Sequence, residues 1–355
     1  MAVPPLLSHR LSLQGLAAPA PVDPVAALTH MVALQAQDGA MALWALGMRT
    51  GGANKASIEA ALNDGRILRT HLLRPTWHLV AASDVRWLLR LSAPQVRQAM
   101  AFMNRHLGLE PAHFTRSRKV FEKTLAAGPC TRAELKAQMD AARISTDETR
   151  MAHLLMDAEL QGQICSGPRR GAQLTYALLD QRVPHHEAGP EGLEAAVLLA
   201  RRYFQSRGPA TLADFTWWSA LPVSLARKAL AVLEKELQPW PSNPHLLHFP
   251  ATSLVPPLPV LLLPAFDEYL IAYRDRSALL AEEHRAPVIT SNGIFRPVVT
   301  VKGRVTATWR AETGRSGVRI SIQLLPGAKP IPQRALATAL RAYSDFLQMP
   351  VRHDA

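Results

Sequence analysis

The sequence predicts a mainly α protein with β-strands, in which a helical module closed by a two-strand ribbon occurs three times before a β-barrel-like domain. One observation is a repeated pattern, Gly-Pro-x-Thr-x-x-acid-apolar, at 128–135 and 208–215. Threonine with an acid three residues later is typical of a helix start, because the hydroxyl accepts a first-turn N–H. The other is a change after residue 254 to short apolar runs separated by turns. Helices followed by a ribbon are the element order of a winged helix, so we expect three tandem winged-helix domains and a C-terminal β-rich domain.

The first module is expected at residues 1–115. A helix is predicted over 22–34, capped by Asp23 and ended by Asp38-Gly39, and a second helix near Ser57 to Asp64. An extended ribbon should follow over 66–80, with its turn at Pro75. Another helix should start at Ser83-Asp84. This order of helices and ribbon predicts the first winged helix.

The second and third modules are expected at residues 116–185 and 190–250. Each should hold a helix, a threonine-capped helix and a longer helix. In the second module a ribbon with a basic tip, Gly167 to Gly171, closes the unit. The segments Arg182–Pro190 and Gln238–Pro244 are rich in proline, histidine and polar residues, which is typical of linkers. The expected helices cover 120–125, the segments after Thr131 and Thr211, 146–160, 193–204 and 222–237.

The last domain is expected at residues 254–355. Turns at Lys302-Gly303 and Thr313-Gly314 should join its strands. A final amphipathic helix over Gln333–Leu347 should pack on the resulting sheet. The expected strands are Val260–Leu263, Val298–Val301, Arg304–Trp309 and Val318–Gln323.

Positive charge is concentrated at the two ends of the chain. The net charge is +12, with 14 Lys and Arg against 7 acids in residues 1–125 and 13 against 8 in residues 251–355. This distribution suits a polyanion that contacts the first and last domains. Arginine supplies 32 of the 40 basic residues. Its planar fork suits phosphate and guanine, but a GC-rich genome explains the preference for arginine equally well.

Several classes of protein are excluded. Two cysteines make neither a disulfide framework nor, alone, a zinc site. There is no signal-peptide pattern and no uninterrupted apolar span, so we expect a cytoplasmic, bacterial-type protein without membrane contact. Motifs of zinc deaminases, nucleotide hydrolases and serine hydrolases are missing. Lys55 is the only lysine in the first 118 residues, which argues against Schiff-base chemistry.

Leu34-Gln35-Ala36-Gln37-Asp38 resembles the Gln-apolar-Gln motif of the AlkZ-like alkylpurine DNA glycosylases, a winged-helix family of the azinomycin-resistance type. The resemblance implies a monomeric, cofactor-free, metal-free enzyme that acts on double-stranded DNA. It implies monofunctional removal of N7- or N3-alkylated purines and, in some members, unhooking of interstrand cross-links. Gln35 and Gln37 would be catalytic by holding the attacking water. Further segments similar to the family lie at 68–80, 216–219, 262–270, 275–276 and 303–309.

Two glutamines suit this chemistry. An alkylated purine is already cationic, so its loss needs a placed water more than proton abstraction. A glutamine carbonyl accepts from the water while its amide donates elsewhere. Residues i and i+2 point the same way only in an extended segment, so Gln35 and Gln37 share a target only if the helix has already ended. The plain alternative is a pair of polar residues at a helix end.

The ribbon and the second wing tip supply the candidate DNA contacts. Alternation places Arg69 and His71 on one strand face, where they would track a phosphate backbone. Trp77 is either a stacking residue or core, and His78 either a phosphate or catalytic partner or a structural histidine. Arg169-Arg170 is either a phosphate contact or a solvated turn. The full set of candidates is Arg66, Arg69, His71, Arg74, Trp77, His78, Arg169 and Arg170.

An acidic cluster, Asp267, Glu268 and Asp275, is the other place to look for catalytic carboxylates. The interpretation we favour is that these acids pair with Arg274 and Arg276 and orient the last domain against the helical ones. Two further functions stay open on the sequence alone. One is a non-enzymatic DNA-binding regulator, and the other is a protein-interaction scaffold.

Overall fold

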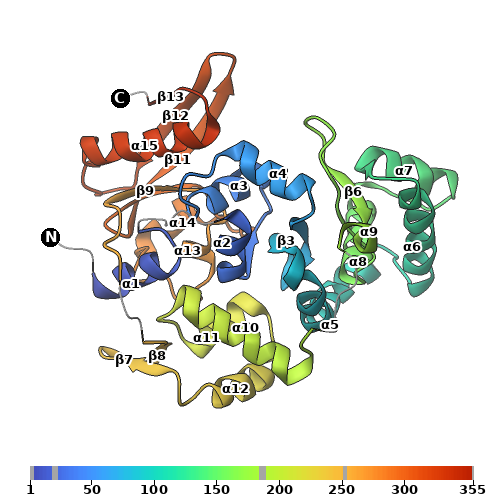
Figure 1. Ribbon diagram of the computed structural model, residues 1–355, viewed down its shortest axis with the longest axis horizontal. Coiled ribbons are helices and arrows are strands. Elements are labelled where there is room, and N and C mark those ends of the chain that lie inside the picture. Colours follow the sequence, from blue (N-terminus) through green and yellow to red (C-terminus); the bar gives the residue numbers. More distant parts are fainter. Residues whose placement is uncertain (1–3, 18–22, 184–188, 251–253, 354–355) are drawn as a thin grey trace.

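The computed structural model describes residues 4–17, 23–183, 189–250 and 254–353 and shows a mixed α/β fold. In Figure 1 the N-terminal unit lies at the centre, and helix α5 leads from it to a second unit at the right. The third unit lies below, and the C-terminal sheet lies at the upper left. The glutamine motif is in the central unit, which all the other parts adjoin.

The first unit has an element order that the second unit repeats: helix, short strand, two helices and two strands. The third unit has the same order, with a single bridge at Ala210 in place of the short strand. Its sheet order is β1-β3-β2. Its elements are α1 (Pro5–Leu13), α2 (Pro24–Met31), β1 (Ala33–Gln35), α3 (Gly39–Gly47), α4 (Lys55–Asn63), β2 (Ile67–Leu72) and β3 (Arg74–Ala81).

Three details of this unit differ from the prediction. The first predicted helix ends at Met31, before the motif, and not at residue 34. Asp38 starts a helix instead of stopping one, because its carboxylate accepts the backbone N–H of Met41 at 3.0 Å and caps α3. The ribbon turns at Leu73, whose φ is +60°, so Pro75 lies inside β3.

Helix α5 (Ala82–His106) connects to a second unit with sheet order β4-β6-β5. In both later units the residue before the capping threonine pairs with the last strand of its ribbon: Cys130 with Tyr176, and Ala210 with Leu247. The elements of the second unit are α6 (Pro111–Ala126), β4 (Cys130–Thr131), α7 (Arg132–Ala141), α8 (Glu148–Leu160), β5 (Ile164–Ser166), β6 (Thr175–Leu178) and α9 (Leu179–Arg182). Those of the third unit are α10 (Gly192–Arg207), α11 (Leu212–Ser219), α12 (Val223–Val232), β7 (Gln238–Trp240) and β8 (Asn243–His248).

Both predicted threonine caps are confirmed. Thr131 and Thr211 accept the N–H of Glu134 and Asp214 at 3.3 and 3.0 Å, and each acid side chain bonds back to the backbone N–H of its threonine. The predicted linker Gln238–Pro244 is wrong, because this segment forms most of the β7–β8 hairpin. The other predicted linker, Arg182–Pro190, lies partly outside the described residues.

The C-terminal region forms one five-stranded sheet in the order β13-β12-β11-β10-β9. β9 and β13 do not pair, so the sheet is a curled half-barrel and not a closed barrel. The final helix is confirmed at its predicted bounds, and the β11–β12 hairpin projects from the molecule (Figure 1). The elements are β9 (Val260–Leu263), α13 (Glu268–Ile271), η1 (Glu282–His284), α14 (Arg285–Val288), β10 (Val298–Val301), β11 (Arg304–Gly314), β12 (Gly317–Leu324), α15 (Gln333–Leu347) and β13 (Val351–His353).

The buried apolar side chains show which parts are packed together. One cluster combines α1, β1, the third unit and the start of the C-terminal region. Another joins α2 to α4 with the C-terminal sheet and α15. The second unit has a cluster of its own around Phe121 and Leu154. The first unit, the third unit and the sheet are therefore one packed body beside which the second unit sits.

Candidate active site

The motif segment is extended. Val32, at 0% exposure, has φ +63° and reverses the chain between α2 and β1. β1 then pairs antiparallel with β3, with Gln35 opposite His78, and the N–H of Ala36 continues the ladder to the carbonyl of Trp77 at 2.7 Å. The helix therefore ends before the glutamines, which is the condition under which their two side chains can point the same way.

Both glutamine carbonyls are held by fixed donors. Arg74 Nη2 donates to Gln35 Oε1 at 2.9 Å, and the backbone N–H of Trp77 donates to Gln37 Oε1 at 3.3 Å. A carbonyl oxygen has two lone pairs, so each amide keeps a place for a water molecule. Gln35 is half-buried and Gln37 is exposed, so neither is enclosed by packed apolar side chains.

The predicted acidic cluster lies behind this segment, with partners other than those expected. Asp267 makes a bidentate pair with Arg49, with both distances 2.9 Å, and Glu268 pairs with Arg207 at 2.7 Å. Both acids are about 1% exposed. Asp275 instead accepts the backbone N–H of Ser277. The predicted pairing with Arg274 and Arg276 is wrong.

The roles of Arg49 and Arg207 were missed by sequence reasoning. They lie 218 and 61 residues from their acids, and no local pattern reports such contacts. The orienting role expected for the two acids fits the structure, because each joins the C-terminal region to another part of the chain.

Comparison with known proteins gives the chain its family. The model of the AlkZ-like DNA glycosylase family matches residues 28–346. The chain belongs to this family. A Streptomyces sahachiroi protein named interstrand DNA cross-link repair glycosylase is 26% identical over 349 residues, covering 91% of each chain. The solved structure of S. sahachiroi DNA glycosylase AlkZ shares the fold, with TM-score 0.82, 22% identity and 98% of each chain covered.

As a member of the AlkZ-like family, the protein is a DNA glycosylase. Membership therefore favours an enzyme over the regulator and the scaffold. Within the described residues, no helix is long and apolar enough to cross a bilayer. No group of three or more His, Cys, Asp or Glu in the same residues is arranged to hold a metal ion.

The ribbon residues of this glycosylase point mostly into the protein. Arg69 and His71 share one sheet face, as predicted, and Trp77 lies opposite His71 on the same face. Arg69 Nε donates to the carbonyl of Ala36 at 3.0 Å, and its guanidinium lies 4.3 Å from the Trp77 ring centre. His71 is buried and bonds Glu159 of α8. The predicted phosphate contact is therefore wrong for His71. Arg69 instead holds the main chain of the motif through its bond to the carbonyl of Ala36.

Of the roles considered for His78, the structure favours a buried structural histidine. It is 0% exposed, and its Nδ1 lies 3.0 Å from the carbonyl of Thr76, an acceptor, so Nδ1 carries the proton. Burial and then the nearby Arg74 charge hold the pKa of His78 well below its usual value, so the ring is neutral. A phosphate contact by His78 is excluded by this burial.

The remaining predicted cations already have carboxylate partners. Arg66 is exposed and lies 3.4 Å from Asp23. Arg170 is exposed and pairs with Glu134 at 2.6 Å. Arg169 is half-buried and pairs with Glu59 at 3.2 Å, and its backbone N–H donates to Asn63 of the same helix. The tip of the β5–β6 ribbon is therefore docked on α4.

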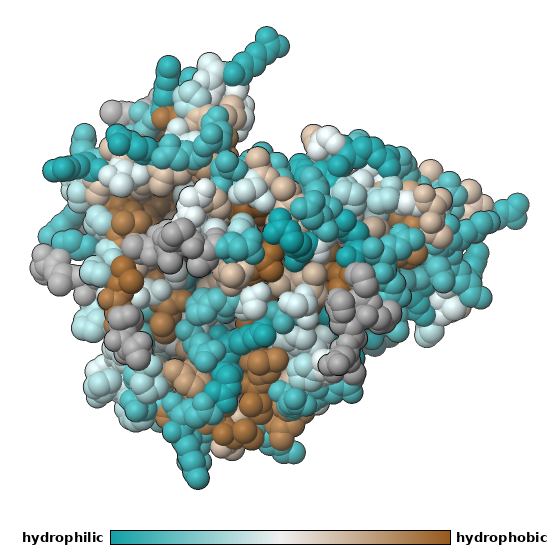
Figure 2. All heavy atoms as spheres, in the orientation of Figure 1, coloured by the Kyte–Doolittle hydropathy of each residue, from teal (hydrophilic) through white to brown (hydrophobic). Residues whose placement is uncertain are grey.

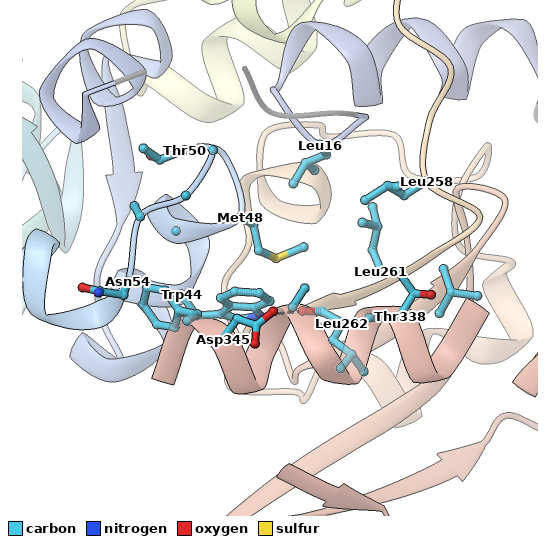
Figure 3. A pocket seen from close by; sticks show the side chains of 18 of the residues that line it. Leu16, Trp44, Met48, Thr50, Asn54, Leu258, Leu261, Leu262, Thr338 and Asp345 are labelled. Atoms are coloured by element: carbon cyan, nitrogen blue, oxygen red, sulfur yellow. Dashed lines mark hydrogen bonds between the residues drawn. The ribbon is translucent and has the colours of Figure 1, made fainter. Parts of the chain in front are cut away.

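An apolar cavity of about 510 Å³ lies between α3, β9 and α15 (Figure 3). Trp44, Met48 and Leu261 are among the side chains that line it. On the face in Figure 2, apolar side chains are visible in a hollow below α15, surrounded by a mostly hydrophilic surface. None of the predicted site residues lines this cavity, so it is separate from the glutamine motif.

Proposed function

We propose that this DNA glycosylase removes N7- and N3-alkylated purines from duplex DNA, with water attacking the sugar and with Gln35 and Gln37 placing that water. The observation that carries the proposal is the extended motif, because it allows both amides to face one target. Their carbonyls are oriented by Arg74 and by the N–H of Trp77 before substrate arrives. Preorganised groups of this kind cost no rearrangement during the reaction.

The chemistry available at the motif suits a cationic leaving group. A carboxylate base would be needed for an unmodified base, and Glu268, which accepts the N–H of Gln35, is 1% exposed. Its Oε2 already accepts from Arg207 and from Trp218 Nε1, at 2.7 and 2.8 Å. Asp38, the exposed acid next to Gln37, has its Oδ1 engaged by the N–H of Met41 at the start of α3. We propose that the amide pair acts on substrates whose glycosidic bond is weakened by their own charge.

The name of the S. sahachiroi relative supports a wider substrate range. That protein is named for interstrand DNA cross-link repair. A cross-link through purine N7 is also an alkylated, cationic purine, so we propose that this chain unhooks such cross-links by the same step.

We propose that each of the three repeated units is a winged helix and that a monomer holds duplex DNA between the first unit, the second wing and the C-terminal region. The β11–β12 hairpin carries the exposed Arg310 and Arg315. Arg66 and Arg170 would exchange their carboxylate partners for phosphates. Exposed ion pairs contribute only about 0–1 kcal/mol, so this exchange costs little.

The test is release of free 7-methylguanine from alkylated duplex DNA under single-turnover conditions. We expect release by the native protein and a loss of at least about tenfold in Gln35→Ala and in Gln37→Ala, the range for removal of one placed catalytic group. Gln98→Ala, which changes an exposed glutamine of α5, is the matched control. Equal release by all four proteins would remove the catalytic assignment. Sequence-selective footprints without any base release would instead support the regulator.

A further inference from the structure

β1 is an edge strand whose outer side is closed by side chains. In the order β1-β3-β2, only one side of β1 meets another strand. On the other side, Arg207 Nη2 donates to the carbonyl of Ala33 at 3.0 Å, and the N–H of Gln35 donates to Glu268 Oε1 at 3.2 Å. The ion pair occupies the place of a neighbouring strand and satisfies backbone groups that an edge otherwise leaves open.

The ion pair is itself buried and makes several hydrogen bonds. Arg207 and Glu268 are 0% and 1% exposed. Arg207 donates from Nε and Nη2 to Glu268 Oε2 at 3.0 and 2.7 Å, and Trp218 Nε1 adds a bond to the same oxygen. Buried charges persist only with such bonding, which also fixes their geometry. Oε1 of Glu268 is thereby directed at Gln35.

We propose that Arg207 and Glu268 are positioning residues for base excision, because they hold the main chain of Gln35 at the outer edge of the sheet. This inference rests on the proposed role of Gln35. Glu268 belongs to α13, and Arg207 is the last residue of α10, so two distant parts of the chain set the position of one glutamine. The side chain of Gln35 is held separately, by Arg74.

The neighbouring acid provides a matched comparison. Asp267 is as buried as Glu268 and also pairs with one buried arginine. That arginine, Arg49, bonds Gln14 and the carbonyl of Ala45, and none of the bonds of the pair reaches β1. Both ion pairs stabilise the fold, but of the two acids only Glu268 contacts Gln35.

The expected size of the effect follows from geometry. A misplacement of about 1 Å costs on the order of 100-fold in rate. We therefore expect Glu268→Asp to slow single-turnover release of 7-methylguanine by about 10- to 100-fold, because the shorter side chain still neutralises Arg207 but does not reach the N–H of Gln35. Affinity for alkylated duplex DNA should stay within about twofold, since the pair is remote from the surface.

The experiment compares full-length Glu268→Asp, Glu268→Gln and Asp267→Asn with the native protein and with Gln35→Ala. Release is measured at a temperature below every melting transition. Hydrogen exchange is followed in the peptide that covers 33–37. We expect faster exchange there and slower release in the two Glu268 variants. In Asp267→Asn we expect lower thermal stability without either change.

Two results would overturn the inference. One is release by folded Glu268→Asp equal to that of Asp267→Asn while Gln35→Ala is inactive. The other is unchanged exchange at 33–37 in Glu268→Asp. Full activity of Gln35→Ala would instead refute the proposed catalytic role itself, so the two failures are distinguishable. If Glu268→Gln does not fold, Glu268→Asp alone decides, because it keeps the buried charge.

Discussion

Arg74 was predicted to bind DNA, and its contact with Gln35 points to another role, which a double-mutant cycle can test. Its Nη2 donates to Gln35 Oε1 at 2.9 Å. The change to make is Arg74→Met, which keeps the apolar stem and removes the donor. Burial lowers the pKa of Arg74. Part of the lost bond is therefore offset by relief of desolvation, and we expect little change in thermal stability.

The magnitude follows from the bond that is removed. A hydrogen bond to a charged group contributes about 1.5–3 kcal/mol. If that energy orients the amide in the transition state, its loss slows release of 7-methylguanine by roughly 10- to 150-fold, at 1.36 kcal/mol per factor of ten. The slowing should appear in the chemical step, because the amide would still be present but free to turn.

The assay is single-turnover release by native protein, Arg74→Met, Gln35→Ala and the double variant. If Arg74 acts through Gln35, the Arg74 change should cost less than about twofold once Gln35 is alanine, which is strong non-additivity. An equal cost in both backgrounds, together with weaker DNA binding, would refute this reasoning. Arg74 would then be a direct DNA contact, as the sequence suggested.

Other expectations concern stability and binding. Thr131→Ala and Thr211→Ala should each lower the free energy of unfolding by about 1 kcal/mol, measured by denaturant titration, through loss of a helix cap; unchanged midpoints would contradict this. Burial and the nearby His248 lower the pKa of His9 to about 4. Between about pH 6.5 and 4 the unfolded chain therefore binds a proton at His9 that the folded protein does not bind. The free energy of unfolding should fall as the pH drops through this range. His9→Gln should flatten that slope in thermal melts, and an unaltered slope would exclude His9 as its source. Arg170→Ala should reduce the salt dependence of duplex binding by about one unit of slope; an identical slope would place the second wing off the DNA.

Local sequence patterns predicted several elements well. The capping threonines, Thr131 and Thr211, and the strong amphipathic period of α15 are short-range signals, and the structure confirms them. The β7–β8 hairpin was taken for a linker because Pro239 and Pro244 suggested irregular chain. Both prolines are tolerated because this sheet has only two strands, so edge positions are available to them.

The candidate site shows the limit of such reasoning. Side-chain direction indicated only a condition, that Gln35 and Gln37 share a target if their segment is extended, and the structure meets it. The partners of Asp267 and Glu268 could not be predicted in this way, because they depend on how separate units pack. Proximity in the sequence suggested Arg274 and Arg276, whereas the buried partners are Arg49, just after α3, and Arg207, the last residue of α10.

The closure of the β1 edge by a distant ion pair has a consequence for truncation and evolution. A fragment lacking the region after residue 254 would leave Arg207 as a bare cation beside an open strand, and such an edge invites self-association. The first unit, the third unit and the C-terminal region are therefore linked and are not independent of one another. On the proposed roles of Gln35 and the Arg207–Glu268 pair, a rearrangement that preserves base excision must keep α10, β1 and α13 together.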